Sequence, residues 1–416
     1  MKPNKETFCV LPFKMMSTTN SGDFRTCCEG LPLGFSAVED SIEDIWNSDF
    51  YKNLRLDLVN GIKHKNCSQC WRRESQGGFS SRLDQNQIIS QDEYNSIINS
   101  FNSKTGELSI YPNLFEFKLG NLCNLKCIMC TQMESSQHET EIKHIKKNYS
   151  DKIPQLLDFI ENNLNEGNEL YRLPKNKIDK AIDNLINLAP YLKTIMLVGG
   201  EPLINPITIK ILQRLYEKGL VDCNIEIITN LSNVDAETLK LLTHFKNLIL
   251  VISYDSVDAD AFHYIRHPAR YDTFTKNLMY VLNNFEFNVT FSLTINVFNV
   301  LEIHNILKQF EKLSRDFPIR ISCNLVVDPK YFSVPYLNVT TKEKASLQIN
   351  NALGFVKESE IGYKNSRLHS ELEGIHALLE KTPEDYIEVR EEMKRVLELY
   401  NKVRNQKFEN IFEYLP

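Results

Sequence analysis

The stretch LFEFKLGNLCNLKCIMC, residues 114–130, joins a short apolar run to three closely spaced cysteines. The run LFEFKL is typical of a buried β-strand, so Cys123, Cys127 and Cys130 fall in the loop after its carboxyl end. Thiolates are soft ligands that suit iron and zinc, but a structural zinc site normally has four protein ligands. Three ligands leave one position open, which a reactive iron-sulfur cluster requires. By itself, the loop could also hold unrelated thiols or part of a zinc site.

Composition restricts the class of protein. The chain has 416 residues, of which 42% are hydrophobic and 25% charged, enough for a large core and two or three structural units. Its net charge of -6 provides no basic field for nucleic acid. The start MKPNKETFCV lacks a long apolar stretch, and runs such as LILVI are too short to span a bilayer. We therefore expect a cytoplasmic protein with neither nucleic-acid nor membrane partners, whose ten cysteines serve metal or redox chemistry rather than disulfides.

Short β-rich runs alternate with helical patterns through the middle of the chain. Six strands are expected at 114–119, 194–200, 224–230, 248–255, 288–296 and 319–327. Helical spacing of apolar residues separates them, at 176–192, 207–219, 235–245, 271–284 and 302–317. This order predicts an α/β fold with a parallel sheet, a partial (β/α)6 TIM-like barrel, whose functional groups gather at the carboxyl edge of the strands. The three cysteines lie at that edge.

Flanking segments complete the predicted organisation. We expect a small N-terminal α+β iron-sulfur domain at 1–90, a linker at 91–111, the partial barrel at 112–330 and a helical C-terminal region at 331–416. The segment from Thr131 to about Lys177 is a long insertion, either a solvated helix face or a lid over the site. In the C-terminal region, Thr382 and Pro383 are expected to start an amphipathic helix, whose apolar stripe either packs on another part of the chain or forms a dimer contact.

A second group of cysteines lies in the first 70 residues. Residues 8–28 read as two strands joined by a glycine-containing turn, residues 41–61 as an amphipathic helix, and CSQC at 67–70 as a tight pair of thiols. We expect one metal site of four thiolates from Cys9, Cys27, Cys67 and Cys70. Cys28 is an alternative to Cys27, and zinc is an alternative to iron and sulfide. Cys223 and Cys323 are each interpreted as small buried hydrophobic residues.

The spacing C-x3-C-x2-C after a first strand resembles the radical S-adenosylmethionine (radical SAM) superfamily. Other strand ends extend the resemblance. It assigns S-adenosylmethionine contacts to Met129, Gly199, Gly200, Glu201, Pro202, Asn230, Ser253, Asp255, Arg266 and Asn296. In GGEP, the glycines allow close approach of the backbone, and the carboxylate of Glu201 suits the cofactor's ammonium group. Met129 departs from the aromatic residue often found before the last cysteine, but its thioether can also pack against adenine.

The N-terminal cysteines resemble a twitch domain, the shortened relative of the SPASM domain, which holds an auxiliary 4Fe-4S cluster. Such a domain usually follows the barrel, whereas here it precedes it. The two resemblances imply a 4Fe-4S cluster on Cys123, Cys127 and Cys130, a second cluster on the other four cysteines, and S-adenosylmethionine. They also imply reductive cleavage to a 5′-deoxyadenosyl radical, which abstracts a hydrogen atom from the substrate.

The expected reaction follows from the number of thiolates at the second site. A cluster with four cysteines cannot easily bind substrate, so it would accept an electron in an oxidation or a crosslink. The substrate is then a peptide, a protein or a small sugar-like molecule, and the electron donor a protein such as flavodoxin or ferredoxin. Tyr254 and Asp328 are candidate proton donors or acceptors. A non-catalytic iron-sulfur electron carrier or a zinc-stabilised structural or binding protein is the alternative, although neither needs an open cluster or GGEP.

Overall fold

The computed structural model describes residues 4–75, 80–149, 170–365 and 367–416. These residues form two compact units, which we describe one at a time. Unit 1 draws on residues 1–121, 165–227 and 237–248, and unit 2 on residues 122–164, 228–236 and 249–416. The chain passes between unit 1 and unit 2 several times, so the limits of the units do not coincide with the domain boundaries expected from the sequence.

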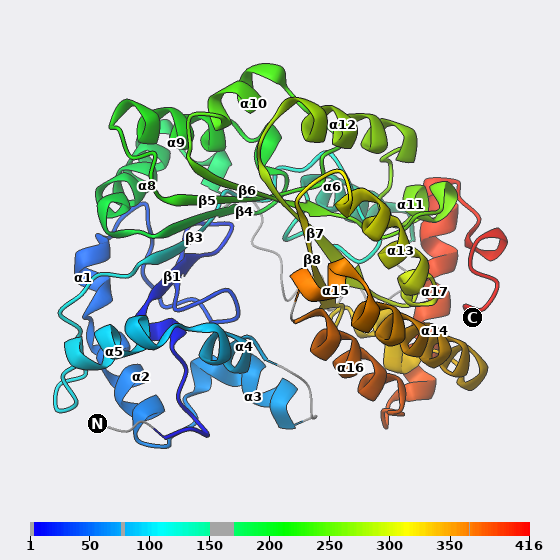
Figure 1. Ribbon diagram of the computed structural model, residues 1–416, viewed down its shortest axis with the longest axis horizontal. Helices are drawn as coiled ribbons and strands as arrows, with labels where there is room; N and C mark the ends of the chain where they lie inside the picture. The colour runs from blue at the N-terminus through cyan, green and yellow to red at the C-terminus, as the bar shows by residue number, and fades with distance from the viewer. Residues whose placement is uncertain (1–3, 76–79, 150–169, 366) are drawn as a thin grey trace. The chain divides into compact units, whose positions relative to one another are not determined.

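Eight strands follow the order β2-β1-β3-β4-β5-β6-β7-β8, which is a mostly parallel α/β arrangement (Figure 1). Their bounds are β1 Met15–Thr18, β2 Phe24–Arg25, β3 Leu114–Lys118, β4 Thr194–Val198, β5 Asn224–Thr229, β6 Asn247–Ser253, β7 Asn288–Ile295 and β8 Ile319–Leu325. Strands β3 to β8 are the six that the sequence predicted, so the α/β fold class is confirmed. Only β2 runs antiparallel to its neighbour among the strand pairs whose register is described.

The N-terminal hairpin joins the sheet of unit 1, which the sequence did not predict. Strand β1 pairs in parallel with β3, and Met15, Met16 and Ser17 lie opposite residues 114–116. Gly22 turns the chain into β2 with a φ of +88°, in the left-handed region that glycine adopts without steric cost. The small iron-sulfur domain is thus continuous with the first edge of the α/β sheet.

Helices of unit 1 surround this sheet and the N-terminal segment. They are α1 Ile42–Trp46, α2 Asp49–Val59, α3 Ser68–Ser75, α4 Ser81–Ile88, α5 Gln91–Ser100, α8 Lys175–Leu188, α9 Pro206–Glu217 and α10 Ala236–Leu242. The single helix expected at 41–61 is two helices. Asn47 explains the break, because its side-chain amide donates to the Leu108 carbonyl at 2.9 Å and its oxygen accepts from the Leu108 N–H at 3.0 Å. The expected linker 91–111 contains α5 and an antiparallel bridge between Phe101 and Leu108.

Unit 2 contains β6 to β8 and most of the C-terminal helices. Its helices are α6 Ser136–Tyr149, α11 Ala259–Ile265, α12 Tyr271–Asn284, α13 Ile303–Ser314, α14 Val339–Glu358, α15 Glu360–Lys364, α16 Leu368–Leu379 and α17 Tyr386–Arg404. The predicted start of the last helix at Thr382 is wrong, because α17 begins at Tyr386. The Asp385 carboxylate before it binds Lys330 Nζ at 2.9 Å and Tyr336 Oη at 2.8 Å instead of capping a turn.

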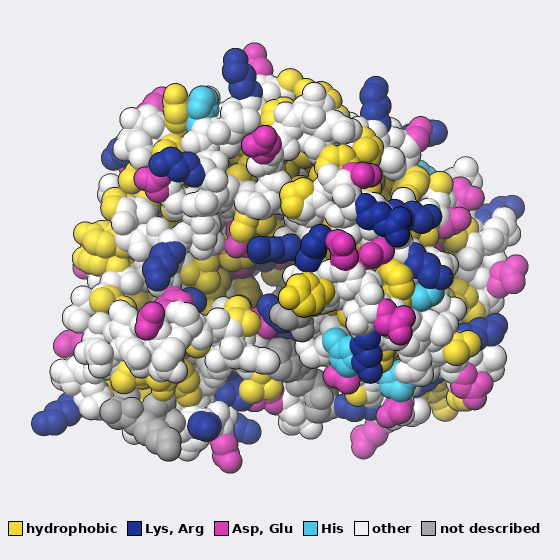
Figure 2. Space-filling model, in the orientation of Figure 1, with side chains coloured by type: hydrophobic (Ala, Val, Ile, Leu, Met, Phe, Trp, Pro, Cys, Tyr) yellow, Lys and Arg dark blue, Asp and Glu magenta, His cyan; other side chains and the backbone are white. Residues whose placement is uncertain are grey.

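Surface composition agrees with the sequence. Lysine, arginine and acidic side chains are interspersed over the visible face of the molecule (Figure 2). Within the described residues, no helix is long and apolar enough to cross a membrane. Helix α6 forms part of the segment expected to be a lid. Residues 150–169 of that segment lie outside the described part of the chain.

Candidate functional site

The three-cysteine loop lies in unit 2 and is fixed by its backbone. The N–H groups of Lys126 and Ile128 each donate at 2.7 Å, to the carbonyls of His267 and Ile265 respectively. The loop thereby pairs with the end of α11 like a short strand. This pairing places the loop beside Arg266, one of the predicted site residues.

The thiols of this loop lie close enough to influence one another. Cys123 is buried, while Cys127 and Cys130 are half-buried. Burial raises the pKa of the Cys130 thiol well above its usual value, and the neighbouring Cys127 and Cys123 raise it further. Burial therefore favours neutral thiols, and the charge of Arg266 offsets this effect only in part at Cys127. Iron would supply the further positive charge that several thiolates need, so the sulfur-only donor set fits a cluster.

Asn230 reaches the same loop from the end of β5. Its side-chain amide donates to Asn124 Oδ1 at 3.1 Å and lies 4.0 Å from the Cys123 sulfur. Its own oxygen accepts from the N–H of Ser232 at 2.9 Å, which fixes the side chain. The structure thus brings Asn230 and the first cysteine together, as the strand order predicted.

Asp255 and Arg266 form a buried pair in unit 2. Asp255 Oδ2 lies 2.7 Å from Arg266 Nε, and both residues are buried. Asp255 also accepts from the N–H of Thr294 at 3.2 Å. The sequence named both residues as cofactor contacts but did not predict that they bind each other. Each therefore positions the other at the edge of the three-cysteine loop.

Two further predicted contacts lie at strand ends in unit 2. Asn296 is fully buried. Its side chain stabilises the turn after β7 by donating to the Thr294 carbonyl at 2.8 Å and accepting from the Phe298 N–H at 2.8 Å. Ser253 ends β6 and lies opposite Ser292 of β7. Met129 is half-buried within the cysteine loop. Their contacts with S-adenosylmethionine remain predictions.

The GGEP turn lies in unit 1, at the end of β4. Gly199 has a φ of +93°, and a Cβ there would lie 2.8 Å from the Gly120 carbonyl oxygen. Only glycine permits this close approach of the two strand ends. Glu201 is buried and caps the turn that Pro202 begins, since its carboxylate accepts from the Leu203 N–H at 3.0 Å. Gly200 also has a positive φ, of +52°.

The N-terminal thiols gather around a small apolar cluster in unit 1. Cys9, Cys27 and Cys67 pack with Leu54 and Leu58. Burial raises the pKa of Cys67 to about 12, with a further rise from the adjacent Cys70. The two segments that carry Cys27 and Cys67 are joined by Asn66, whose side chain accepts from Thr26 Oγ1 at 2.9 Å and donates to the Leu31 carbonyl at 3.1 Å.

Cys28 differs from Cys27 in exposure. Cys27 is buried within the cluster of apolar residues and thiols, whereas Cys28 is exposed. The Cys28 carbonyl accepts from Arg25 at 3.0 Å, which fixes the backbone after the ligand position. Among the described residues, no three His, Cys, Asp or Glu side chains are arranged as they stand to enclose a metal ion. The fit of the N-terminal site to a cluster therefore rests on the chemistry of its four thiol donors and on the packing of Cys9, Cys27 and Cys67 in one group of residues.

Sequence reasoning missed the residues that hold both cysteine sets in place. They are Lys126, His138, Glu141 and Arg404 around the three-cysteine loop, and Asn66, Glu74, Arg82 and Asn86 around the N-terminal thiols. Lys126 and Asn66 lie next to cysteines in the sequence, whereas tertiary contacts bring the other six residues to the sites. Of the earlier candidates, Tyr254 directly follows β6, but its side chain is buried among aromatic rings, with its hydroxyl 3.1 Å from that of Tyr271.

Comparison with known proteins agrees with these two sites. Residues 117–310 match the radical SAM superfamily model, and residues 9–71 match SPASM, an iron-sulfur cluster-binding domain. The search of curated proteins found no match. Similar solved structures include Streptococcus suis SuiB bound to S-adenosylmethionine, at 14% identity and a TM-score of 0.37. Another is TYW1 with a lysine-pyruvate adduct, at 13% identity and a TM-score of 0.31.

The alignments differ in how much of each protein they span. They cover 74% of this chain and 62% of SuiB, and 70% of this chain and 90% of TYW1. The cofactors follow from the two family models rather than from these structures: S-adenosylmethionine and a 4Fe-4S cluster for the first, and auxiliary iron-sulfur binding for the second. Residues 117–310 thus belong to the radical SAM superfamily, and residues 9–71 form a SPASM iron-sulfur cluster-binding domain.

Proposed function

We propose that this protein is an oxidising radical SAM enzyme that removes a hydrogen atom from an unactivated C–H group of a polar substrate. The observation that carries the proposal is the partition of the cysteines. Three lie in a loop that leaves one iron of a cluster open, and four others, Cys9, Cys27, Cys67 and Cys70, lie together elsewhere in the chain. An electron carrier or a zinc protein has no need of the open position.

Residues of the chain would bind the reactive cluster and S-adenosylmethionine. Cys123, Cys127 and Cys130 would hold the reactive cluster, and Asn230 and Glu201 would contact S-adenosylmethionine. When bound, this cofactor and the cluster supply a 5′-deoxyadenosyl radical. The buried Asp255–Arg266 pair keeps a fixed charge arrangement beside the loop. Fixed dipoles and exclusion of water are the contributions that the protein itself makes to such chemistry.

The strands of unit 2 support a polar substrate. Side chains of β6 to β8 alternate, and the less buried face carries a row of serines, Ser253, Ser292 and Ser322, paired across neighbouring strands. Asn324 donates to Ser292 at 3.1 Å on this face, and Arg320 lies on it one row away. Hydroxyl and amide groups at this density bind hydrogen-bonding groups rather than a hydrocarbon chain. This face suits a peptide backbone or a hydroxyl-bearing small molecule.

Atoms and electrons balance as a two-electron oxidation of the substrate. With one electron from a donor protein, such as flavodoxin or ferredoxin, bound S-adenosylmethionine would supply the 5′-deoxyadenosyl group, leaving methionine. The substrate would give this group a hydrogen atom, which completes 5′-deoxyadenosine, and would then lose one electron to the auxiliary site and one proton to a base. The product is an unsaturated or crosslinked form of the substrate.

Formation of 5′-deoxyadenosine tests the proposal directly. Anaerobically reconstituted protein should hold about seven to eight irons if both sites carry 4Fe-4S clusters. With dithionite and S-adenosylmethionine, the wild type should release 5′-deoxyadenosine, and Cys127→Ala should release none and lose about half of its iron. Cys223→Ala is the matched control, because this half-buried thiol belongs to neither set, and it should behave like the wild type.

Two results would reject the proposal. One is 5′-deoxyadenosine formation by Cys127→Ala at the wild-type rate. The other is full iron content in the variant with Ala at Cys123, Cys127 and Cys130. Because cleavage in some enzymes awaits the substrate, binding of S-adenosylmethionine to reconstituted wild type is measured alongside, by the change it causes in the cluster's electron paramagnetic resonance (EPR) signal. Absence of that change would also count against the assignment.

A further inference from the structure

Helix α4 lies beyond the matched SPASM residues, yet it supplies a buried cation beside the N-terminal thiols. Arg82 on this helix is only 4% exposed. Arginine is almost never buried at this level unless it is paired. Its partners therefore indicate what the side chain does.

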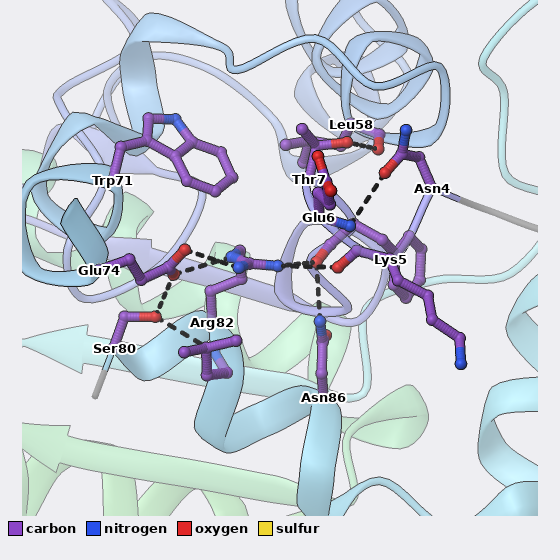
Figure 3. A network of polar contacts seen from close by, with 12 residues as sticks. Asn4, Lys5, Glu6, Thr7, Leu58, Trp71, Glu74, Ser80, Arg82 and Asn86 are labelled. Carbon is purple, nitrogen blue, oxygen red and sulfur yellow. Dashed lines mark hydrogen bonds and ion pairs between the residues drawn. The ribbon is translucent and has the colours of Figure 1, made fainter. Parts of the chain in front are cut away.

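Arg82 binds two segments that carry cysteines (Figure 3). Its Nε and Nη2 atoms donate to the two carboxylate oxygens of Glu74, at 2.9 Å and 2.6 Å. Its Nη1 atom donates to the Phe8 carbonyl at 2.9 Å, immediately before Cys9. Glu74 lies one helical turn after Cys70 on α3. The guanidinium group thus connects the backbone at Cys9 with the helix that carries Cys70.

Asn86, one turn later on α4, holds the other side of Cys9. Its amide nitrogen donates to the Phe8 carbonyl at 2.7 Å, and its oxygen accepts from the Val10 N–H at 2.9 Å. Both peptide groups next to Cys9 are therefore fixed by α4. Ser80, the N-cap of this helix, closes the arrangement by donating to Glu74 at 2.5 Å.

The charge of Arg82 also reaches the thiols. Its guanidinium group lies one peptide group from Cys9 and, through Glu74, one helical turn from Cys70. The backbone of Arg82 also forms a hydrogen bond with the Cys70 thiol. The Trp71 ring lies 5.0 Å from the guanidinium carbon and covers it. Positive charge and N–H groups near cluster sulfurs stabilise the reduced, more negative cluster.

We propose that Arg82 is a positioning residue of the auxiliary cluster, which holds Cys9 and Cys70 in place and raises the reduction potential of that cluster. The proposal rests on the auxiliary site of the proposed function and extends it to a residue outside the cysteine motif. The consequence is an auxiliary site that accepts an electron from the substrate radical more readily. Asn86 shares the positioning role but carries no charge, so the two effects can be separated.

The test uses the full chain with Ala at Cys123, Cys127 and Cys130, so that the auxiliary cluster is the only one present. Into this background we place Arg82→Gln, Arg82→Lys, Asn86→Ala and the control Arg72→Gln, which removes a charge from an exposed position on α3. Redox titration followed by EPR spectroscopy gives the midpoint potential, and chelation by bipyridyl gives the rate of iron loss.

We expect Arg82→Gln to lower the midpoint, so that the ratio of reduced to oxidised cluster at the original midpoint falls several-fold. Arg82→Lys keeps the charge and should retain most of the midpoint while losing iron faster, because lysine cannot reproduce the two-pronged contact with Glu74. Asn86→Ala should lose iron faster at an unchanged midpoint. Arg72→Gln should match the background in both measurements.

Different results overturn different claims. A midpoint that is the same in Arg82→Gln, Arg82→Lys and Arg72→Gln would reject the role of Arg82 while leaving the auxiliary cluster intact. If Arg82→Gln fails to fold, an unchanged rate of iron loss in both Arg82→Lys and Asn86→Ala would reject it instead. A background protein that binds no iron at all would reject the auxiliary site itself, and with it part of the proposed function.

Discussion

At the scale of single residues, exposure distinguishes Cys27 from its neighbour Cys28, which the sequence leaves as an alternative ligand. Cys27 is buried and packs with Cys9, whereas Cys28 is exposed. A cluster ligand must lie where the other thiols converge. The turn after Cys27, closed by a hydrogen bond from the Gly30 N–H to the Cys27 carbonyl at 3.1 Å, directs the chain away from the site. Burial is therefore consistent with Cys27 as the ligand, and the assignment stays a prediction.

This ranking gives a prediction for iron binding. We expect Cys27→Ala to lose about half of the iron, because one of two 4Fe-4S clusters loses a ligand, and Cys28→Ala to retain it. Iron analysis and the visible absorbance of anaerobically reconstituted protein provide the measurement. Cys323→Ala, which removes a buried thiol from β8, controls for cysteine loss as such. Greater iron loss in Cys28→Ala than in Cys27→Ala would reverse the ligand assignment.

Glu302 allows a prediction about pH. Its carboxylate accepts from Ser256 Oγ at 2.8 Å and from the Val257 N–H at 3.3 Å. Burial raises the pKa of Glu302 above its usual value, and these hydrogen bonds offset the rise only in part. The folded protein therefore holds this proton more tightly than the unfolded chain does. The resulting stabilisation is complete below the unfolded pKa of about 4.3 and is lost as pH rises through the folded pKa.

Replacing Glu302 by glutamine removes this titration. We expect the free energy of unfolding of Glu302→Gln, relative to the wild type, to increase from about pH 4 to about pH 7. Denaturant unfolding of the metal-free protein at several pH values measures this difference. Glu286→Gln, at an exposed position, serves as the control for the loss of a surface carboxylate. A difference for Glu302→Gln that is constant over this range would contradict the prediction.

At the scale of elements, the last helix is connected to the three-cysteine loop through a buried acid. Arg404 ends α17 and donates through Nε and Nη2 to the carboxylate of Glu141 on α6, at 3.0 Å and 2.6 Å. Lys126, between the first two cysteines, lies 2.7 Å from the same carboxylate. His138 on α6 lies 2.8 Å from the Cys127 carbonyl. Two helices far apart in the sequence thus hold one loop.

Breaking this contact should weaken the loop. Both Arg404 and Glu141 are nearly inaccessible, at 0% and 1% side-chain exposure, so Glu141→Gln leaves the buried Arg404 and the half-buried Lys126 without their acid. Removing one partner of a buried ion pair costs about 3–5 kcal/mol. We expect this loss in denaturant unfolding, together with faster hydrogen exchange of residues 122–130. Glu360→Gln, at an exposed i,i+4 pair with Lys364, is the control and should cause no measurable change. Equal exchange in both variants would show that α17 does not restrain the loop.

At the scale of the whole molecule, the repeated alternation of strands and helices could be predicted from the sequence. Strands β3 to β8 lie where alternating and continuous apolar runs predicted them, because the spacing of apolar residues reflects which face of an element is buried. The three-cysteine spacing and GGEP were readable for the same reason: each is a local pattern, and local patterns need no knowledge of distant chain. The helix start expected at Thr382 was wrong: α17 begins at Tyr386, and the Asp385 side chain before it binds Lys330 instead of capping the helix.

The α/β class, the two cysteine sets and their cofactors could be predicted from the residues, since each depends on residue type and short-range spacing. The distant residues that support those sets are visible only in the folded chain. Three sets of contacts join residues that are 74 to 263 positions apart in the sequence. They are the parallel pairing of β1 with β3, the hydrogen bonds of Arg82 and Asn86 to the backbone around Cys9, and the ion pair of Arg404 with Glu141. Such contacts depend on how elements pack, and burial of a charge becomes possible only where packing supplies its partner.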